Sequence, residues 1–194
     1  MKRVLFGIMA LSVATFAANP GTGTATTEGT ASVPVKVLAE ITAPQAGLTI
    51  TDEAGTVLDE LLIDHGRIVK GAATDDSKAF KLFKVKMGDS SNEYVEMNGK
   101  LTVNLNKYTT KLIGPNSGKL DSVLSLAGGK TNATGGYEAE INGTEHTGRV
   151  NSVIPRDQLN ATKLEEGIYN NGADRPTLTV VYTPTPTGTG GVGN

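Results

Sequence analysis

The chain has 194 residues, a formal net charge of −2 at pH 7 and no cysteine. This charge balance argues against nucleic acid or an anionic membrane surface as the partner. The lack of cysteine excludes disulfides and thiolate metal sites, so packing, backbone pairing or assembly must stabilise the fold. Aromatic residues make up 5% of the chain and tryptophan is absent, which weakens the case for a sugar-stacking platform.

Residues 1–18 have the pattern of a secretory signal. Lys2 and Arg3 precede an apolar run over 4–16, and small residues follow at Ala17 and Ala18. The run is too short to span a bilayer comfortably. We therefore expect export through the Sec pathway. A leader over 19–30, rich in Gly and Thr, is predicted to be flexible.

The next segment, 31–43, has strict two-residue periodicity. In an extended chain, one face carries Val33, Val35, Val37, Ala39 and Ile41. Two interpretations stay open. The segment is the first strand of an ordinary sandwich, or it is a strand lent to a neighbouring subunit, which its place behind a loose leader favours.

Short apolar runs separated by turn residues fill the rest of the chain. Strands are predicted over 47–51, 61–69 with a bend at Gly66, 79–87, 101–105 after an Asn98-Gly99 turn, 137–141, 148–154 and 177–182. Helix is limited to a turn or two within 152–166 by Pro155. This pattern predicts an all-β immunoglobulin-like sandwich over 44–183, followed by a flexible tail over 184–194.

Sequence motifs for catalysis or metal binding are weak. His65 and His146 lie in unrelated segments. His65 has Asp64 or Asp75 as candidate partners, although a surface or edge-strand position is favoured. Five carboxylates could hold Ca²⁺ but do not match an EF-hand loop: Asp52, Glu53, Asp59, Glu60 and Asp64. Ser125 and Ser152 lack a nucleophile-elbow context. We expect no enzyme activity, no metal and no cofactor.

Two segments resemble the major pilins of the chaperone–usher route, particularly the alpha type of colonization-factor and common-pilus subunits. The first is VPVKVLAEI, then Thr42-Ala43-Pro44, then a new strand at GLTI. The second is LEEGIYNNGADRPTLTVVY, in which Gly167 and Tyr169 hold the positions that open the closing hairpin. The run IDHGRIVKG is also similar to a Leu-Asp-Phe-Gly-like motif of related pilin-like domains, with His65 in place of the aromatic.

The resemblance implies a sandwich that lacks its own final strand and is completed by donor-strand exchange. The donor would be 31–43, and the acceptor groove would be lined by Leu178, Val180 and Tyr182. Implied partners are identical subunits in a fibre, a periplasmic chaperone and an outer-membrane usher during assembly, and a host-surface receptor. The chain would pass through the periplasm to a surface fimbria and support adhesion or biofilm formation. The alternative is a monomeric secreted sandwich that binds a carbohydrate or a host receptor.

Overall fold

The computed structural model describes residues 47–88, 93–161 and 164–185. All of them belong to one of the two units into which the chain divides, Glu40–Asn194. The predicted signal, leader and donor segment 31–43 lie outside the described residues, as does most of the predicted tail. No helix among the described residues is long and apolar enough to cross a membrane.

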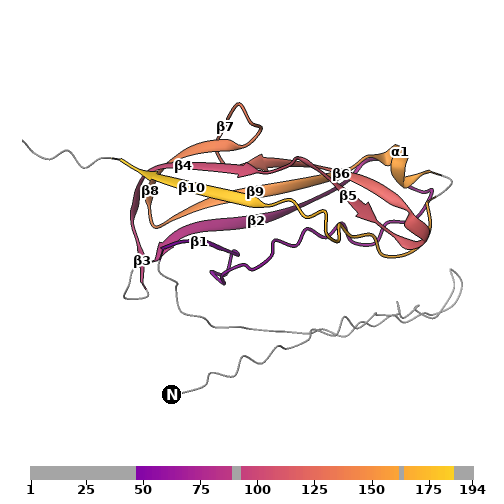
Figure 1. The fold of residues 1–194 in the computed structure, drawn as a ribbon, viewed down its shortest axis with the longest axis horizontal. Helices are drawn as coiled ribbons and strands as arrows, with labels where there is room; N and C mark the ends of the chain where they lie inside the picture. Colours follow the sequence, from indigo (N-terminus) through magenta and orange to yellow (C-terminus); the bar gives the residue numbers. More distant parts are fainter. Residues whose placement is uncertain (1–46, 89–92, 162–163, 186–194) are drawn as a thin grey trace, which may run out of the picture. The chain divides into compact units, whose positions relative to one another are not determined.

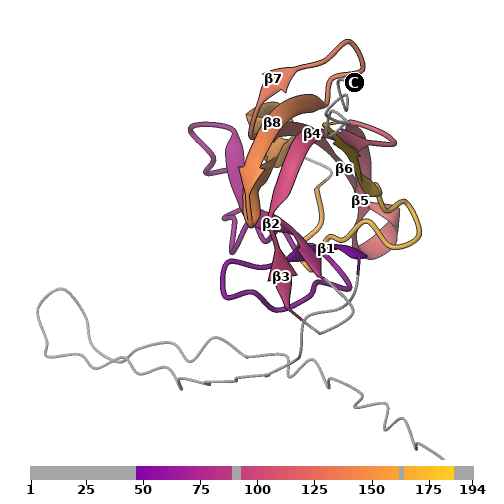
Figure 2. The ribbon, with the colours of Figure 1, turned by 90° about the vertical axis from the view of Figure 1, so that its left-hand side faces the viewer.

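The predicted all-β class is confirmed, since antiparallel strands in two sheets dominate (Figure 1). The first sheet runs, in spatial order, through β1 (Gly47–Thr51), β2 (Ser77–Gly88), β9 (Glu145–Ile154), β6 (Lys119–Ala127) and β5 (Thr109–Ile113), with β3 (Tyr94–Val95) pairing at the end of β2. The second runs through β10 (Leu178–Pro184), β4 (Met97–Leu105), β8 (Tyr137–Gly143) and β7 (Lys130–Thr131). Figure 2 shows β7, β8 and β4 above β1, β2 and β3. The short helices are η1 (Pro115–Ser117) and α1 (Arg156–Leu159).

The main core lies between the two sheets. Alternating residues of β2 and β4 point into it, and Phe83, Val85, Leu101 and Val103 are fully buried. Tyr137 of β8 is 1% exposed. A smaller cluster of Leu120, Ile154 and Leu159 lies apart from this core, with Tyr169 packed against it.

Two predicted local features are wrong. Residues 61–69 form no strand, because no neighbouring strand pairs with their backbone among the described residues. Asn98-Gly99 is not a turn but lies within β4. Gly99 is required there by close packing, since a Cβ atom at this position would lie 2.2 Å from the carbonyl oxygen of Thr183.

The final strand is longer than the predicted 177–182. Thr183 and Pro184 pair in register with Lys100 and Gly99, and the amide of Thr185 donates to the carbonyl of Asn98 at 2.9 Å. Pro184 is tolerated because an edge strand needs no amide donor on its unpaired side.

Candidate strand-acceptor edge

β10 is the outermost strand of the second sheet, and β4 is its one partner among the described strands. Thr177 and Thr185 both bond to β4 or to the residue just after it, so the odd-numbered residues of β10 direct their backbone groups toward β4. The even-numbered residues 178, 180 and 182 therefore direct their amides and carbonyls away from it. We call this row of backbone groups, with which no described strand pairs, the acceptor edge.

The same three residues carry the apolar side chains predicted to line the groove. Leu178, Val180 and Tyr182 are half-buried and pack against the main core, whereas Thr179 and Val181 between them are exposed. The structure thus places the predicted residues together on one face of β10. Their face is apolar, and no strand in the described ranges occupies the adjacent backbone edge.

Tyr182 is held rigidly at its end of this row. Its hydroxyl donates to the carbonyl oxygen of Asn98 and accepts from the amide of Asn98, both at 2.9 Å. Because both contacts are made to one residue of β4, they hold the Tyr182 ring at the end of the apolar row.

A segment without regular secondary structure, residues 58–69, follows β1 and covers part of the same core; we call it the strap. Leu58, Leu61 and Ile63 pack against the main cluster, which Leu178, Val180 and Tyr182 also contact. In Figure 1 the strap is the indigo and purple coil between β1 and β2. Within the described part of the chain, residues 59–68 make no backbone-to-backbone hydrogen bond.

Two charged contacts bring the strap and β5 to the segment just before β10. Glu60 of the strap bonds Arg175 at 2.7 Å, and both side chains are more than half exposed. Asp174 pairs with Lys107 and accepts the amide of Lys111 at 3.0 Å. Lys107, followed by that amide, lowers the pKa of the Asp174 carboxyl. These contacts fix where β10 begins.

The predicted closing motif, Gly167 and Tyr169, anchors the chain before it enters β10. Tyr169 lies against Gly114 and Gly118 at the β5–β6 connection, and a Cβ atom on Gly114 would lie 2.4 Å from its ring. A Cβ on Gly167 would meet Pro115 at 2.4 Å. The glycines are thus needed for close packing around one aromatic ring. The sequence pattern identified Tyr169 but not the two glycines that receive it.

His65 is half-buried and hydrogen-bonded through both ring nitrogens, whereas the sequence favoured a surface or edge-strand position. Its Nδ1 lies 2.9 Å from the hydroxyl of Ser77, and its Nε2 lies 2.7 Å from the hydroxyl of Ser152. Ser152 in turn lies 2.6 Å from the hydroxyl of Ser122. Neither predicted carboxylate partner takes part, because the imidazole faces the sheet. Burial lowers the pKa of His65, and the Asp64 charge partly opposes this.

Several other candidate polar residues make local structural contacts. His146 is hydrogen-bonded to Tyr137 at 3.2 Å, and burial lowers the pKa of its imidazole. Asp52 caps its own turn by accepting the amide of Thr56, and Asp64 accepts the amide of Gly66. No group of three His, Cys, Asp or Glu side chains within the described ranges could hold a metal ion.

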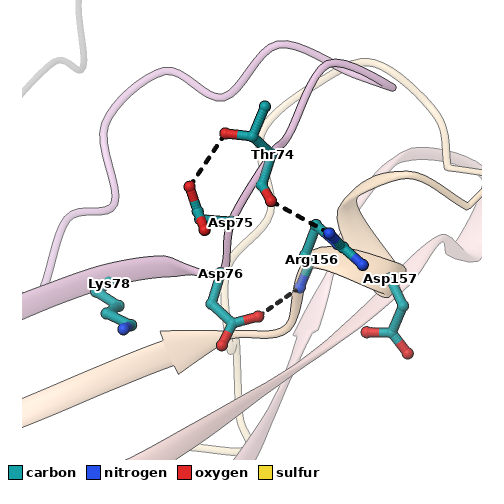
Figure 3. Close-up of a pocket in the computed structure, with 6 residues that line it drawn as sticks. All are labelled: Thr74, Asp75, Asp76, Lys78, Arg156 and Asp157. Atoms are coloured by element: carbon teal, nitrogen blue, oxygen red, sulfur yellow. Dashed lines mark hydrogen bonds between the residues drawn. The ribbon is translucent and has the colours of Figure 1, made fainter.

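A surface hollow lies where the chain approaches β2 beside α1 (Figure 3). Its lining residues are Thr74, Asp75, Asp76, Lys78, Arg156 and Asp157. The Asp76 carboxylate accepts the amide of Arg156 at 3.0 Å, and the Arg156 guanidinium donates to the carbonyl of Thr74 at 3.3 Å. These bonds join the approach to β2 to α1, which is a structural role.

Comparison with known proteins does not assign the chain to a family. No family model matches the chain, and no curated protein matches it significantly. The functional argument therefore rests on the acceptor edge and its surroundings.

Proposed function

We propose that the chain is a structural subunit, a major pilin, of a surface fimbria. Each copy would lend segment 31–43 to the acceptor edge of the adjacent copy. The observation that carries this proposal is the acceptor edge, where unpaired backbone groups run beside a half-buried apolar row. An added strand satisfies such a backbone edge and buries the apolar row in one step.

The donor segment matches this edge chemically. Alternating apolar residues 33, 35, 37, 39 and 41 would lie beside the inward row of β10 when the backbones pair. Burying Val33, Val35, Val37 and Ile41 contributes roughly 6–12 kcal/mol gross, at about 1.5–3 kcal/mol for each side chain. Backbone hydrogen bonds add about 0.5–1.5 kcal/mol each. This is comparable to the stability of a whole domain.

The same reasoning extends to assembly partners and location. A sandwich with an open apolar edge is prone to uncontrolled pairing, so a periplasmic chaperone would cover it until an outer-membrane usher exchanges it for the next subunit. A host-surface receptor would be engaged by the finished fibre, and no nucleic acid is involved.

A matched pair of charge variants tests the donor assignment. Val37→Asp places a carboxylate on the apolar face of the donor, where its desolvation costs several kcal/mol, whereas Lys36→Asp changes the opposite face. We expect Val37→Asp to abolish polymers while Lys36→Asp assembles normally, as measured by light scattering after size-exclusion chromatography.

Normal yields of polymer from the Val37→Asp protein would contradict the donor assignment. A stable wild-type monomer that does not polymerise would instead favour the monomeric binding module. The exported protein with its full chain is the sample in every case, so that the donor and the edge are both present.

A further inference from the structure

The imidazole of His65 joins the strap to three strands of the first sheet. Ser77 is the first residue of β2, Ser152 belongs to β9 and Ser122 belongs to β6. Their hydroxyls form a continuous chain with the ring, Ser77 to His65 to Ser152 to Ser122, with contacts of 2.9, 2.7 and 2.6 Å. Ser122 and Ser152 are 2% and 4% exposed. Together with the apolar contacts of the strap, this chain of hydrogen bonds attaches the middle of the strap to the first sheet.

The hydrogen bonding favours a neutral ring. A neutral imidazole offers one donor and one acceptor, so one of its serine neighbours donates to it. A protonated imidazole has two donors and no acceptor, so both neighbouring hydroxyls must turn their hydrogens elsewhere. The Ser77 hydroxyl is half-buried and can turn its hydrogen toward water. The Ser152 hydroxyl must instead donate to Ser122, whose own hydroxyl hydrogen then needs an acceptor in a buried position. The charge must also lose its hydration inside the fold.

Few charged groups oppose this preference. Asp64 precedes His65 in the strap and is the carboxylate whose charge favours the protonated ring. On β2, the alternation that points Ser77 inward also places Lys81 on the inward side, so the charged residue that this strand adds on the inward side is a cation and not a carboxylate. Ser152 on β9 and Ser122 on β6 are uncharged, and so are the inward residues Thr110 and Leu112 of β5.

We propose that His65 is a positioning residue that docks the strap as the neutral imidazole, and that its protonation releases the strap. The strap shares the main core with the acceptor edge through Leu58, Leu61 and Ile63. Losing these contacts uncovers part of the core against which the apolar row of β10 also packs. The consequence for strand acceptance rests on the proposed function, whereas strap docking does not. A fibre subunit built this way accepts its neighbour at neutral pH and less well in acid.

The direction of the pH dependence is set by the lowered pKa of His65. The free imidazole titrates near pH 6.5, and the docked one titrates below that value. Docking is therefore at full strength above pH 6.5 and weakens as the pH falls from 6.5 toward the docked pKa. One proton changes the docking equilibrium by at most about tenfold per pH unit.

Methyl and imidazole NMR of the full chain between pH 7.5 and 5.0 tests strap docking directly. We expect the Ile63 methyl signal to leave its core-packed position with the same midpoint as the His65 ring, while the Ile50 methyl of β1 stays unchanged. In His65→Gln, which cannot titrate, the Ile63 signal should be independent of pH. His146→Gln removes the other buried imidazole and should leave the Ile63 transition as in the wild type.

An Ile63 signal that does not move in the wild type, or that still moves in His65→Gln, would overturn the proposal. The wild-type and His146→Gln measurements keep the test decisive should His65→Gln fail to fold. Polymer yields at pH 7.5 and 5.5 form a separate arm, in which acid should reduce assembly of the wild type but not of His65→Gln. A normal Ile63 transition without polymer at either pH would refute the fimbrial function and leave the role of His65 supported.

Discussion

Val180 and Val181 are adjacent on β10 but have opposite surroundings. Val180 is half-buried against the main core, and Val181 is 51% exposed on the outer face of the sheet. Their backbone groups differ too, because Val181 pairs with Thr102 of β4 in the bonded register and Val180 turns its amide and carbonyl to the acceptor edge. A substitution at Val180 therefore tests the apolar row, whereas a substitution at Val181 tests the strand alone.

Aspartate at these two positions should have different effects. Val180→Asp puts a carboxylate against the core and should lower the free energy of unfolding by about 2–4 kcal/mol and block assembly. Val181→Asp should change the stability by less than about 1 kcal/mol, since its side chain faces water. Urea unfolding and polymer yield measure both effects. Equal behaviour of the two variants would mean that the inward row of β10 is not the acceptor surface.

At the scale of elements, β10 is positioned by contacts at both of its ends. Before it, Asp174 and Arg175 bind Lys107 and Glu60, and Tyr169 packs against glycines of the β5–β6 connection. After it, pairing continues through Pro184 to the amide of Thr185. An edge strand with one partner depends on such end contacts, since it has half the ladder of a central strand.

Two truncations separate the contribution of the strand from that of the C-terminal residues after it. A chain ending at Thr185 keeps the whole described ladder of β10 and should retain the wild-type stability. A chain ending at Tyr182 loses the pairing of Thr183 and Pro184 and the Thr185–Asn98 bond, and should lose about 1–3 kcal/mol for a few backbone hydrogen bonds. Thermal unfolding compares them; equal midpoints would show that residues beyond Tyr182 do not secure the strand.

The sequence predicted strands best where burial alternates. The two-residue pattern of β2 and β10 identified both strands and the inward set Leu178, Val180 and Tyr182. It failed for the strap, which alternates at 61, 63 and 65 yet pairs with no described strand, because alternation reports burial on one face and not hydrogen bonding. β3, β5, β6 and β7 were not predicted; β3 has two residues, and β5 and β7 are short edge strands with few buried residues.

The polar part of the site was less predictable than the apolar part. His65 lies 12 residues from Ser77 and 87 residues from Ser152, so no local sequence motif predicts these contacts. The spacing of Gly114 and Gly118 likewise does not predict from the sequence that both glycines lie against Tyr169. Such long-range contacts depend on how the sheets stack, which a single sequence does not specify.

For the whole molecule, the central claim is that segment 31–43 of one copy pairs with the acceptor edge of another. Inward residues of β10 have even numbers, and the alternating apolar residues of the donor segment have odd numbers in the sequence. Outward residues Lys36, Leu38 and Glu40 would therefore lie opposite outward residues such as Val181. Because residues opposite Val181 would form a non-hydrogen-bonded pair, their Cβ atoms would be close enough for a disulfide.

Disulfide trapping tests this pairing most directly, since the chain has no cysteine of its own. A Val181→Cys protein is mixed with an isotope-labelled protein carrying Lys36→Cys, Leu38→Cys or Glu40→Cys, and the products are weighed by mass spectrometry. Val123→Cys, 48% exposed on β6 of the other sheet, is the control partner. The account predicts a mixed disulfide between Val181→Cys and at least one donor variant, and none with the control. Absence of a mixed disulfide from all three, or its formation only within one chain, would contradict strand exchange between subunits.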